Sequence, residues 1–189
     1  MNALKPSLIA LQARLDQFAR LTGHASAWLC LLLVLVTTVI VVLRYRFDIG
    51  SIALQEAATY LHASLLMLAM AYTLSLDEHV RVDIFYRNWP TKRKGLVDLI
   101  GTLLFLLPLC IALFVYSYEY VLTSWRIQEG SADAGGLPFV YALKSLLLIM
   151  PVLLALQAIS EALRALLRLT GDKDQTVENG HDGEGQGWS

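Results

Sequence analysis

Residues 25–43 are nineteen consecutive residues without a charged side chain, and this run constrains the fold more than any other feature. At about 1.5 Å per residue, a helix of that length crosses a hydrocarbon core of about 30 Å. The run is longer than the apolar region of a signal peptide, and Leu43-Arg44-Tyr45-Arg46 ends it without a small-residue cleavage pattern. We therefore predict a transmembrane helix that remains as an uncleaved signal anchor.

Three further apolar stretches have the length of membrane spans. They cover about residues 57–76, 99–118 and 139–159, and each is bounded by charges or by Gly and Pro. The composition agrees, because 16% of the residues are charged, whereas a soluble domain has about 25%. Pro108 and Pro151 lie within spans and are predicted to kink their helices, whose neighbours satisfy the freed carbonyls. The sequence thus predicts an all-α integral membrane protein with a packed four-helix domain over residues 23–170.

Lysine and arginine residues outside the spans are distributed unevenly. The N-terminal segment, the connection 77–98 and the residues after the fourth span, which include Arg164 and Arg168, hold eleven of them, and the first and third connections, counted with Lys144, hold four. The positive-inside rule therefore predicts that both termini and the connection 77–98 face the cytoplasm. Residues 172–189 contain five acidic residues and four glycines and almost nothing apolar, so we predict a disordered cytoplasmic tail over residues 171–189.

The segment 1–22 has an apolar pattern of its own. Its large apolar residues fall within about 80° of arc on a helix; they are Leu4, Leu8, Leu11, Leu15 and Phe18. Polar and charged residues take the opposite side, and Pro6 suits a first helical turn. We predict an amphipathic interfacial helix on the inner membrane surface, with the chain turning into the bilayer at Gly23. The alternative is a short coiled-coil seam that binds a partner.

Few polar side chains lie within the predicted spans. Glu56 begins the second span and Lys144 lies about one turn inside the fourth, both at the outer end, which favours snorkelling to the interface over a buried ion site. One face of the second span is polar and small and is predicted to pack against protein; it comprises Gln55, Thr59, His62, Leu66, Ala69 and Thr73. His62 has no acidic neighbour three or four residues away, which favours a hydrogen-bonded packing residue over a proton relay or a haem ligand.

Several functional classes lack the residues they need. A cytochrome b anchor needs two histidines at matching depth, but His24 lies at the inner end of its span and His62 nearer the outer end of the next. A thiol oxidoreductase needs paired cysteines, whereas Cys30 and Cys110 lie in different spans. A proton-coupled exporter needs an acidic residue in mid-membrane, which the predicted spans lack. With no nucleotide-binding, hydrolase or metalloprotease motif and no basic stripe for nucleic acid, the sequence favours a chain that is not an enzyme and holds no cofactor or metal.

A set of short motifs lies in and after the second span. Glu56 opens that helix, and a His-x-x-Val-Asp element follows it as His79-Val80-Arg81-Val82-Asp83. Later features are Gly101 and Pro108 in the third helix, Gln128-Glu129-Gly130-Ser131 and Gly135-Gly136-Leu137-Pro138 in the third connection, and the closing Leu156-Gln157-Ala158-Ile159-Ser160. Over about residues 20–165 these features resemble the small membrane subunit of tripartite ATP-independent periplasmic (TRAP) transporters. Details are similar to the branch often labelled mannitol or chloroaromatic.

The resemblance implies a three-part importer of the bacterial inner membrane. In such a system a periplasmic binding protein delivers an organic acid or similar solute to a small and a large membrane subunit, and a sodium gradient drives uptake without ATP. The large subunit carries the elevator-type movement, so this chain is expected to be a scaffold that braces it and to contain neither the solute site nor the sodium site. The candidate subunit-interface or structural residues are Glu56, His62, His79, Arg81, Asp83, Glu129 and Lys144.

Two alternatives stay open at this point. The element from His79 to Asp83 is either a solvated cytoplasmic turn or, as we favour, an ordered element held by charge-assisted hydrogen bonds to helix ends or a partner. The whole chain is either the TRAP subunit or a non-transporting four-helix accessory or assembly protein of another inner-membrane complex. Composition alone does not separate these two functions.

Overall fold

In a computed structural model the chain forms helices and short connections, with no strand in the described residues, which are 5–76 and 90–169. The elements are α1 (Lys5–Phe47), α2 (Ile52–Ser75), α4 (Thr91–Gly101), the π-helical segment η1 (Thr102–Leu106), α5 (Leu107–Arg126) and α6 (Val140–Leu169). Because α4, η1 and α5 follow one another without a break, they form one rod. Within the described part, four helical stretches are long and apolar enough to cross a membrane. The predicted fold class, an all-α protein with four spanning helices, is confirmed.

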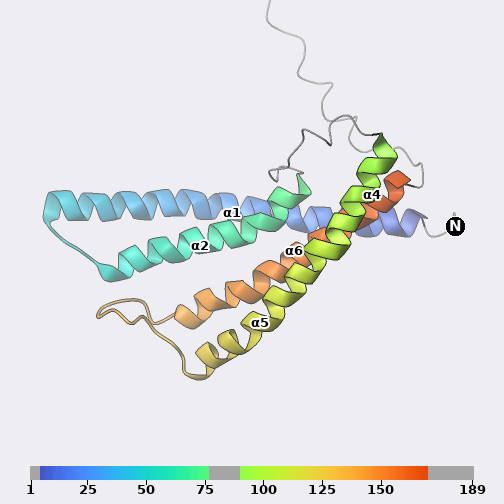
Figure 1. Cartoon of the computed structure of the whole chain (residues 1–189). Coiled ribbons are helices and arrows are strands. Elements are labelled where there is room, and N and C mark those ends of the chain that lie inside the picture. Colours follow the sequence, from blue (N-terminus) through green and yellow to red (C-terminus); the bar gives the residue numbers. More distant parts are fainter. Residues whose placement is uncertain (1–4, 77–89, 170–189) are drawn as a thin grey trace, which may run out of the picture.

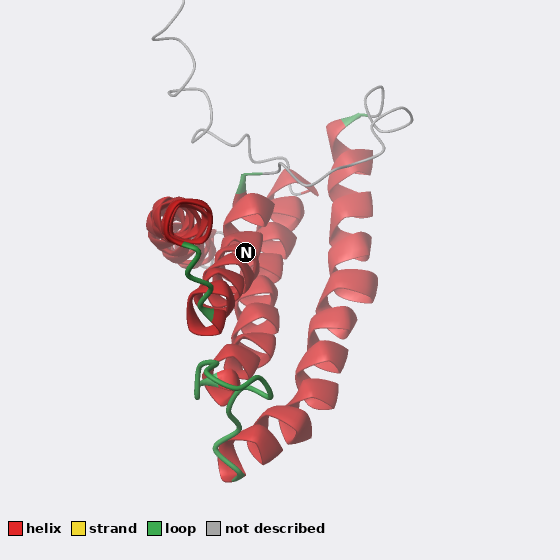
Figure 2. Ribbon diagram, turned by 90° about the vertical axis from the view of Figure 1, so that its left-hand side faces the viewer, coloured by secondary structure: helices red, strands yellow, loops and turns green. Residues whose placement is uncertain are grey.

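Helix α6 lies between the other helices. On one side of it α1 and α2 form an antiparallel pair, and on the other side the α4–η1–α5 rod runs beside it (Figure 1). Figure 2 shows the rod at one edge of the bundle, with α6 and the α1–α2 pair on the same side of it. We call the end that carries the connections 48–51 and 127–139 the loop end, and the end where α1 begins and α6 terminates the opposite end.

The most deeply buried side chains belong to α6. Ala158 is 0% exposed and Ala165 1%, and Leu154 forms a small core with Leu74 of α2 and Cys110 of α5. Small residues on a helix allow its neighbours to approach closely, as is common between helices in membranes. The outward faces of α1 and of the rod are aliphatic or aromatic and exposed, which suits contact with lipid; they include Val34, Leu35, Val39, Phe105, Ile111 and Val115.

Helix α1 corrects one prediction. It runs from Lys5 to Phe47 without interruption, so the predicted turn at Gly23 is wrong. The reason is packing: Gly23 is buried against the ring of Tyr72 on α2, and the hydroxyls of Thr22 and Ser26 donate to carbonyls of their own helix, each at 2.8 Å. At 43 residues, α1 is about 65 Å long, roughly twice the thickness of a hydrocarbon core.

The other helices begin or end outside the predicted spans. Ser51 caps α2 by accepting a hydrogen bond from the N–H of Leu54 at 3.4 Å, so this helix begins five residues earlier than predicted. The distortion predicted at Pro108 is the π-helical turn before it, where the N–H of Leu107 reaches back to the carbonyl of Thr102. Pro151 lies inside α6, which continues to Leu169.

Some predictions fall on residues that the structure does not describe. The ordered element that includes His79, Arg81 and Asp83 lies outside the described residues, as does the tail 171–189. Both remain predictions.

The contact between α1 and α2 at Gly23 gives a first testable expectation. A Cβ atom at residue 23 would lie 2.3 Å from Cγ of Tyr72, closer than real Cβ atoms approach. We expect Gly23→Ala to lower the stability of the purified protein by about 1–3 kcal/mol, the usual range for overpacking. Thermal unfolding in detergent measures this.

Gly101→Ala is the matched control, because a Cβ at that helical glycine would have no neighbour within 4 Å. Alanine also favours a helix over glycine, so this variant should be at least as stable as the unmodified chain. Equal midpoints of unfolding for Gly23→Ala and Gly101→Ala would contradict the close contact.

Candidate functional site

The connection between α5 and α6 positions Glu129. Helix α5 ends at Arg126, Gln128 two residues later lies in the left-handed region at φ 49°, and the N–H of Glu129 donates to the carbonyl of Ser124 at 3.0 Å. The N–H of Tyr141 in turn donates to the carbonyl of Glu129 at 3.4 Å. These bonds hold Glu129 beside the first turns of α6.

Glu129 and Lys144 form an ion pair at the loop end. The Nζ atom of Lys144 donates to Oε2 of Glu129 at 2.5 Å and lies 4.0 Å from the centre of the Tyr120 ring on α5. The hydrogen bond from Lys144 is the main reason that the pKa of Glu129 lies below its usual value. A lowered carboxyl pKa contributes stability that is present above the unfolded pKa and lost as the pH falls through the folded pKa. The pair is therefore formed at neutral pH.

Glu56 links α2 to the same connection. Its carboxylate accepts a hydrogen bond from Oγ of Ser131 and another from the N–H of Leu137, the latter at 2.6 Å. Gly136 makes room for this arrangement, because a Cβ there would lie 2.3 Å from Oγ of Ser131 and 2.7 Å from Oε1 of Glu56. We call Glu56, Ser131, Gly136 and Leu137 the loop clasp. It joins α2 to the connection between α5 and α6.

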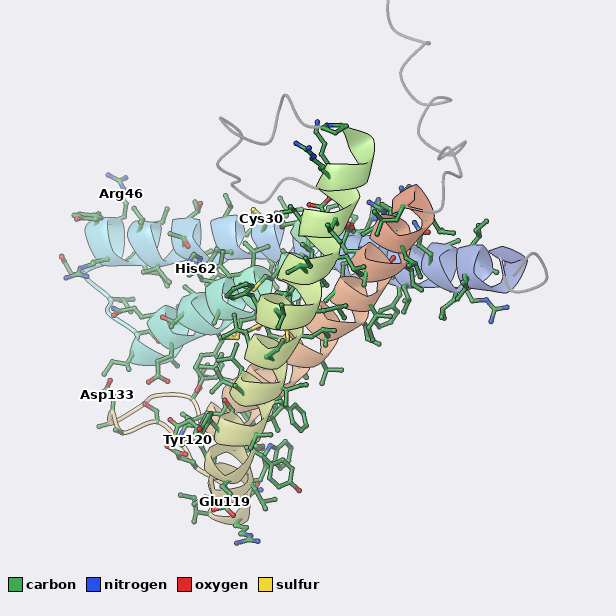
Figure 3. The ribbon with its side chains drawn as sticks, turned by 45° about the vertical axis from the view of Figure 1, so that its right-hand side comes forward. Cys30, Arg46, His62, Glu119, Tyr120 and Asp133 are labelled. Carbon is green, nitrogen blue, oxygen red and sulfur yellow. The ribbon has the colours of Figure 1, made fainter. Side chains whose placement is uncertain are left out.

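The loop clasp and the ion pair change the interpretation of two predicted residues. Snorkelling to the interface was the favoured account of both Glu56 and Lys144. In the structure each has protein partners instead, because the connection 127–139 folds back over the ends of α2 and α6. Glu56 and Lys144 are not paired with each other; each binds a different part of this connection. Figure 3 shows Asp133 and Tyr120 at this end of the molecule.

A second polar cluster joins α1 to α6 near the opposite end. Asp16 accepts hydrogen bonds from Nε2 of Gln157 at 3.1 Å, Oγ of Ser160 at 2.6 Å and Nη2 of Arg164 at 2.9 Å. Gln157 is 1% exposed and Ser160 0%, and Arg164 also pairs with Glu161 at 3.2 Å. We call Asp16, Gln157, Ser160 and Arg164 the Asp16 cluster. Charge-assisted bonds of this kind are stronger than neutral ones.

The polar face predicted on α2 does not pack against this chain over its first half. Gln55, Thr59 and His62 are exposed, and Leu66 is 54% exposed, whereas Ala71 and Leu74 on another side of α2 are buried. His62 is exposed and makes no hydrogen bond with any described residue, so its role as a hydrogen-bonded packing residue stays a prediction that the described part of this chain does not fulfil. Because α2 begins at Ile52, His62 also lies nearer the middle of its helix than predicted (Figure 3).

Taken together, the polar side chains at the two ends bind elements to one another. Glu56 and Asp16 each bind donors from a different element. A family model described as "Tripartite ATP-independent periplasmic transporters, DctQ component" matches residues 33–168. The chain belongs to this family. No curated protein and no solved structure matched the chain.

The match to the DctQ family covers all the polar residues at the loop end but only part of the Asp16 cluster. It includes the loop clasp, the ion pair and His62, and it includes the α6 side of the Asp16 cluster but begins after Asp16 itself. The structure brings Glu56 and Glu129 to one connection, and it leaves His62 apart from them. It also adds Asp16, which the sequence reasoning missed.

One signal for the Asp16 cluster was present in the sequence. Gln157, Ser160 and Arg164 follow each other at intervals of three and four, which places them on one face of a helix. A polar face that continues an apolar span needs a polar partner inside the DctQ chain or outside it. Asp16 was instead assigned to the solvent side of the segment 1–22, because a local pattern does not show a partner in a distant helix.

The Asp16 cluster gives the second testable expectation. Replacing Asp16 by alanine leaves the donors of Gln157, Ser160 and Arg164 without their acceptor. Truncating one member of a fully desolvated charge pair costs about 2–5 kcal/mol, and because Asp16 and Arg164 are each 18% exposed the loss here should lie toward the lower end. We expect Asp16→Ala to lower the thermal unfolding midpoint of the DctQ protein clearly, and Asp16→Asn to lower it less, because asparagine keeps an acceptor oxygen.

Glu119→Ala is the matched control for charge removal, since Glu119 is exposed on α5 (Figure 3). It should leave the midpoint nearly unchanged. An Asp16→Ala protein as stable as Glu119→Ala would show that the Asp16 cluster does not hold α1 to α6.

Proposed function

We propose that this small TRAP membrane subunit acts as a rigid brace for the large transport subunit during sodium-coupled uptake. The solute is an organic acid or a similar small molecule, which a periplasmic binding protein delivers. In this account the chain carries out no chemical reaction and does not itself move the solute. Membership of the DctQ family supports transport over the alternative role as an accessory protein of another complex.

The observation that carries the proposal is the use of polar side chains at both ends of the bundle. Glu56 binds Ser131 and Leu137, Lys144 binds Glu129, and Asp16 binds three groups on α6. A coupling site needs polar groups that converge in mid-membrane and become free during transport. Groups that hold helices to one another suit a chain that keeps its shape.

The orientation of the chain is part of the proposal. The eleven-to-four division of cations supports cytoplasmic termini, and in this proposed orientation the loop end lies at the periplasmic face of the inner membrane. The connection 127–139 then lies on the side where a periplasmic binding protein arrives. On the cytoplasmic side, Arg81 and Asp83 are proposed to bind a helix end or the large subunit, with His79 in the same element.

The first part of α1 is proposed to lie at the cytoplasmic interface. Leu11, Phe18 and Leu21 are 46%, 47% and 67% exposed, and Arg14 and Arg20 are exposed beside them. Apolar side chains with arginines near them suit the boundary between acyl chains and headgroups. Asp16 lies in the same stretch and binds α6. This part of α1 is therefore proposed to contact both the bundle and lipid.

A sodium titration tests the brace directly. Glu56→Gln removes the charge of the loop clasp but keeps one acceptor oxygen, so the clasp should weaken and the complex should become less abundant or less active. We expect the maximal rate of solute uptake into proteoliposomes to fall, while the sodium concentration for half-maximal uptake stays the same. Glu119→Gln serves as the control and should change neither quantity.

The opposite result is equally clear. If Glu56→Gln shifts the sodium requirement strongly at equal abundance of the complex, coupling chemistry resides in this chain. The proposal that this chain acts as a rigid brace would then be wrong.

A further inference from the structure

The middle of α2 exposes an ionisable side chain that has no hydrogen-bond partner among the described residues. His62 follows Ile52 by ten residues and precedes Ser75 by thirteen, which places it about 15 Å from one end of the helix and about 20 Å from the other. It is exposed and forms no hydrogen bond with any described residue. An imidazole has one donor and one acceptor even when neutral, and leaving these unsatisfied in hydrocarbon is costly.

The other outward faces of the bundle differ from this one. At comparable depth α1 exposes Leu35, and the rod exposes Val115 eleven residues before its end at Arg126. Thr37 and Thr38 of α1 are also exposed, but neither is ionisable, and the hydroxyl of Thr38 donates to the carbonyl of Val34 at 2.8 Å within its own helix. These faces suit acyl chains. The α2 face does not, because ionisable side chains inside a membrane almost always face protein or a water-filled cavity.

The neighbours of His62 suit a helix as the partner. Thr59 and Leu66 lie on the same face one turn away on each side, and Ala69 and Thr73 continue it toward the opposite end. Thr59 and Thr73 satisfy their hydroxyls with carbonyls of their own helix, at 3.1 Å and 3.0 Å. Small side chains without free polar groups allow a second helix to approach closely, and His62 then needs one polar side chain from it.

The depth of His62 selects among the partners that the family provides. A periplasmic protein contacts the loop end and does not reach about 15 Å into the bilayer. A membrane-embedded subunit, in contrast, has helices at this depth.

We propose that the α2 face formed by Thr59, His62, Leu66 and Thr73 binds a transmembrane helix of the large transport subunit, which presents a polar side chain to His62 in mid-membrane. The inference rests on the proposed function in so far as the large subunit is the partner of this chain. It goes further by assigning the interface to α2 rather than to α1 or the rod. It also assigns His62 as the residue that sets the depth of the contact.

Photocrosslinking in the intact complex tests this assignment. The photoreactive amino acid p-benzoylphenylalanine is placed at residue 62 or at residue 66, and the adducts are identified by mass spectrometry after illumination of membranes that contain both subunits. Residue 115 is the control, because Val115 is 60% exposed and lies at a similar distance from the loop end. We expect adducts with the large subunit from residues 62 and 66 and none from residue 115.

A substitution series adds a readout for the hydrogen bond. His62→Leu removes both polar atoms, and the association of the two subunits should weaken roughly threefold, the size of one interhelical hydrogen bond in a membrane. His62→Asn keeps a donor and an acceptor and should restore part of the loss. Leu35→Ala, on the lipid-facing side of α1, should leave association unchanged.

The outcomes that overturn the inference are separate from those that overturn the function. Adducts from residues 62 and 66 with lipid alone, or with a second copy of this chain, overturn the assignment of α2 even when uptake is normal. Adducts with the large subunit from residue 115 alone move the interface to the rod. If the two subunits do not purify together at all, the proposed function itself fails.

Discussion

A polar group that is removed from water must find its partner within protein, because apolar surroundings offer none. In this chain the hydrogen bonds that satisfy the polar groups also hold the helices together. Glu56 of α2 takes donors from the connection before α6, and Asp16 of α1 takes three donors from α6 itself. Each carboxylate is satisfied only while two elements stay together. Separation of these elements would therefore expose buried polar groups as well as apolar surface.

This arrangement explains how a bundle with a small internal core keeps its shape. The buried core around Leu74, Cys110 and Leu154 is limited, and many large apolar side chains of α1 and the rod face outward. Around the Asp16 cluster α6 also buries the small residues Ala158 and Ala165. Lipid tails are as apolar as these aliphatic faces, so contact between them carries no free-energy penalty. Bonds of this kind at both ends are what the proposed brace for a moving subunit requires.

The sequence predicted the class of the fold because membrane spans leave a strong signal. The charge-free run 25–43 and its three successors gave the number of helices, and Glu56 and Lys144 stood out because charges near spans are rare. Asp16 escaped notice because an acidic residue on an amphipathic segment also suits water, and its partners lie more than 140 residues away. The turn at Gly23 was wrong for a related reason, since a glycine that breaks a helix and one that admits Tyr72 look alike in sequence. The polar face of α2 predicted packing against protein, and its first half is exposed in this chain.

The central claim is that this subunit keeps its shape while its partner moves. A distance measurement between two spin labels tests it most directly, with one label at Asp133 in the exposed loop and the other at Arg93 in α4, and with exposed Cys30 replaced by alanine. In reconstituted complexes the account predicts one distance distribution that is the same without ligand, with sodium, and with sodium and solute-loaded receptor. A mean distance that shifts with sodium or solute would contradict the account and make this subunit a moving part of the transporter.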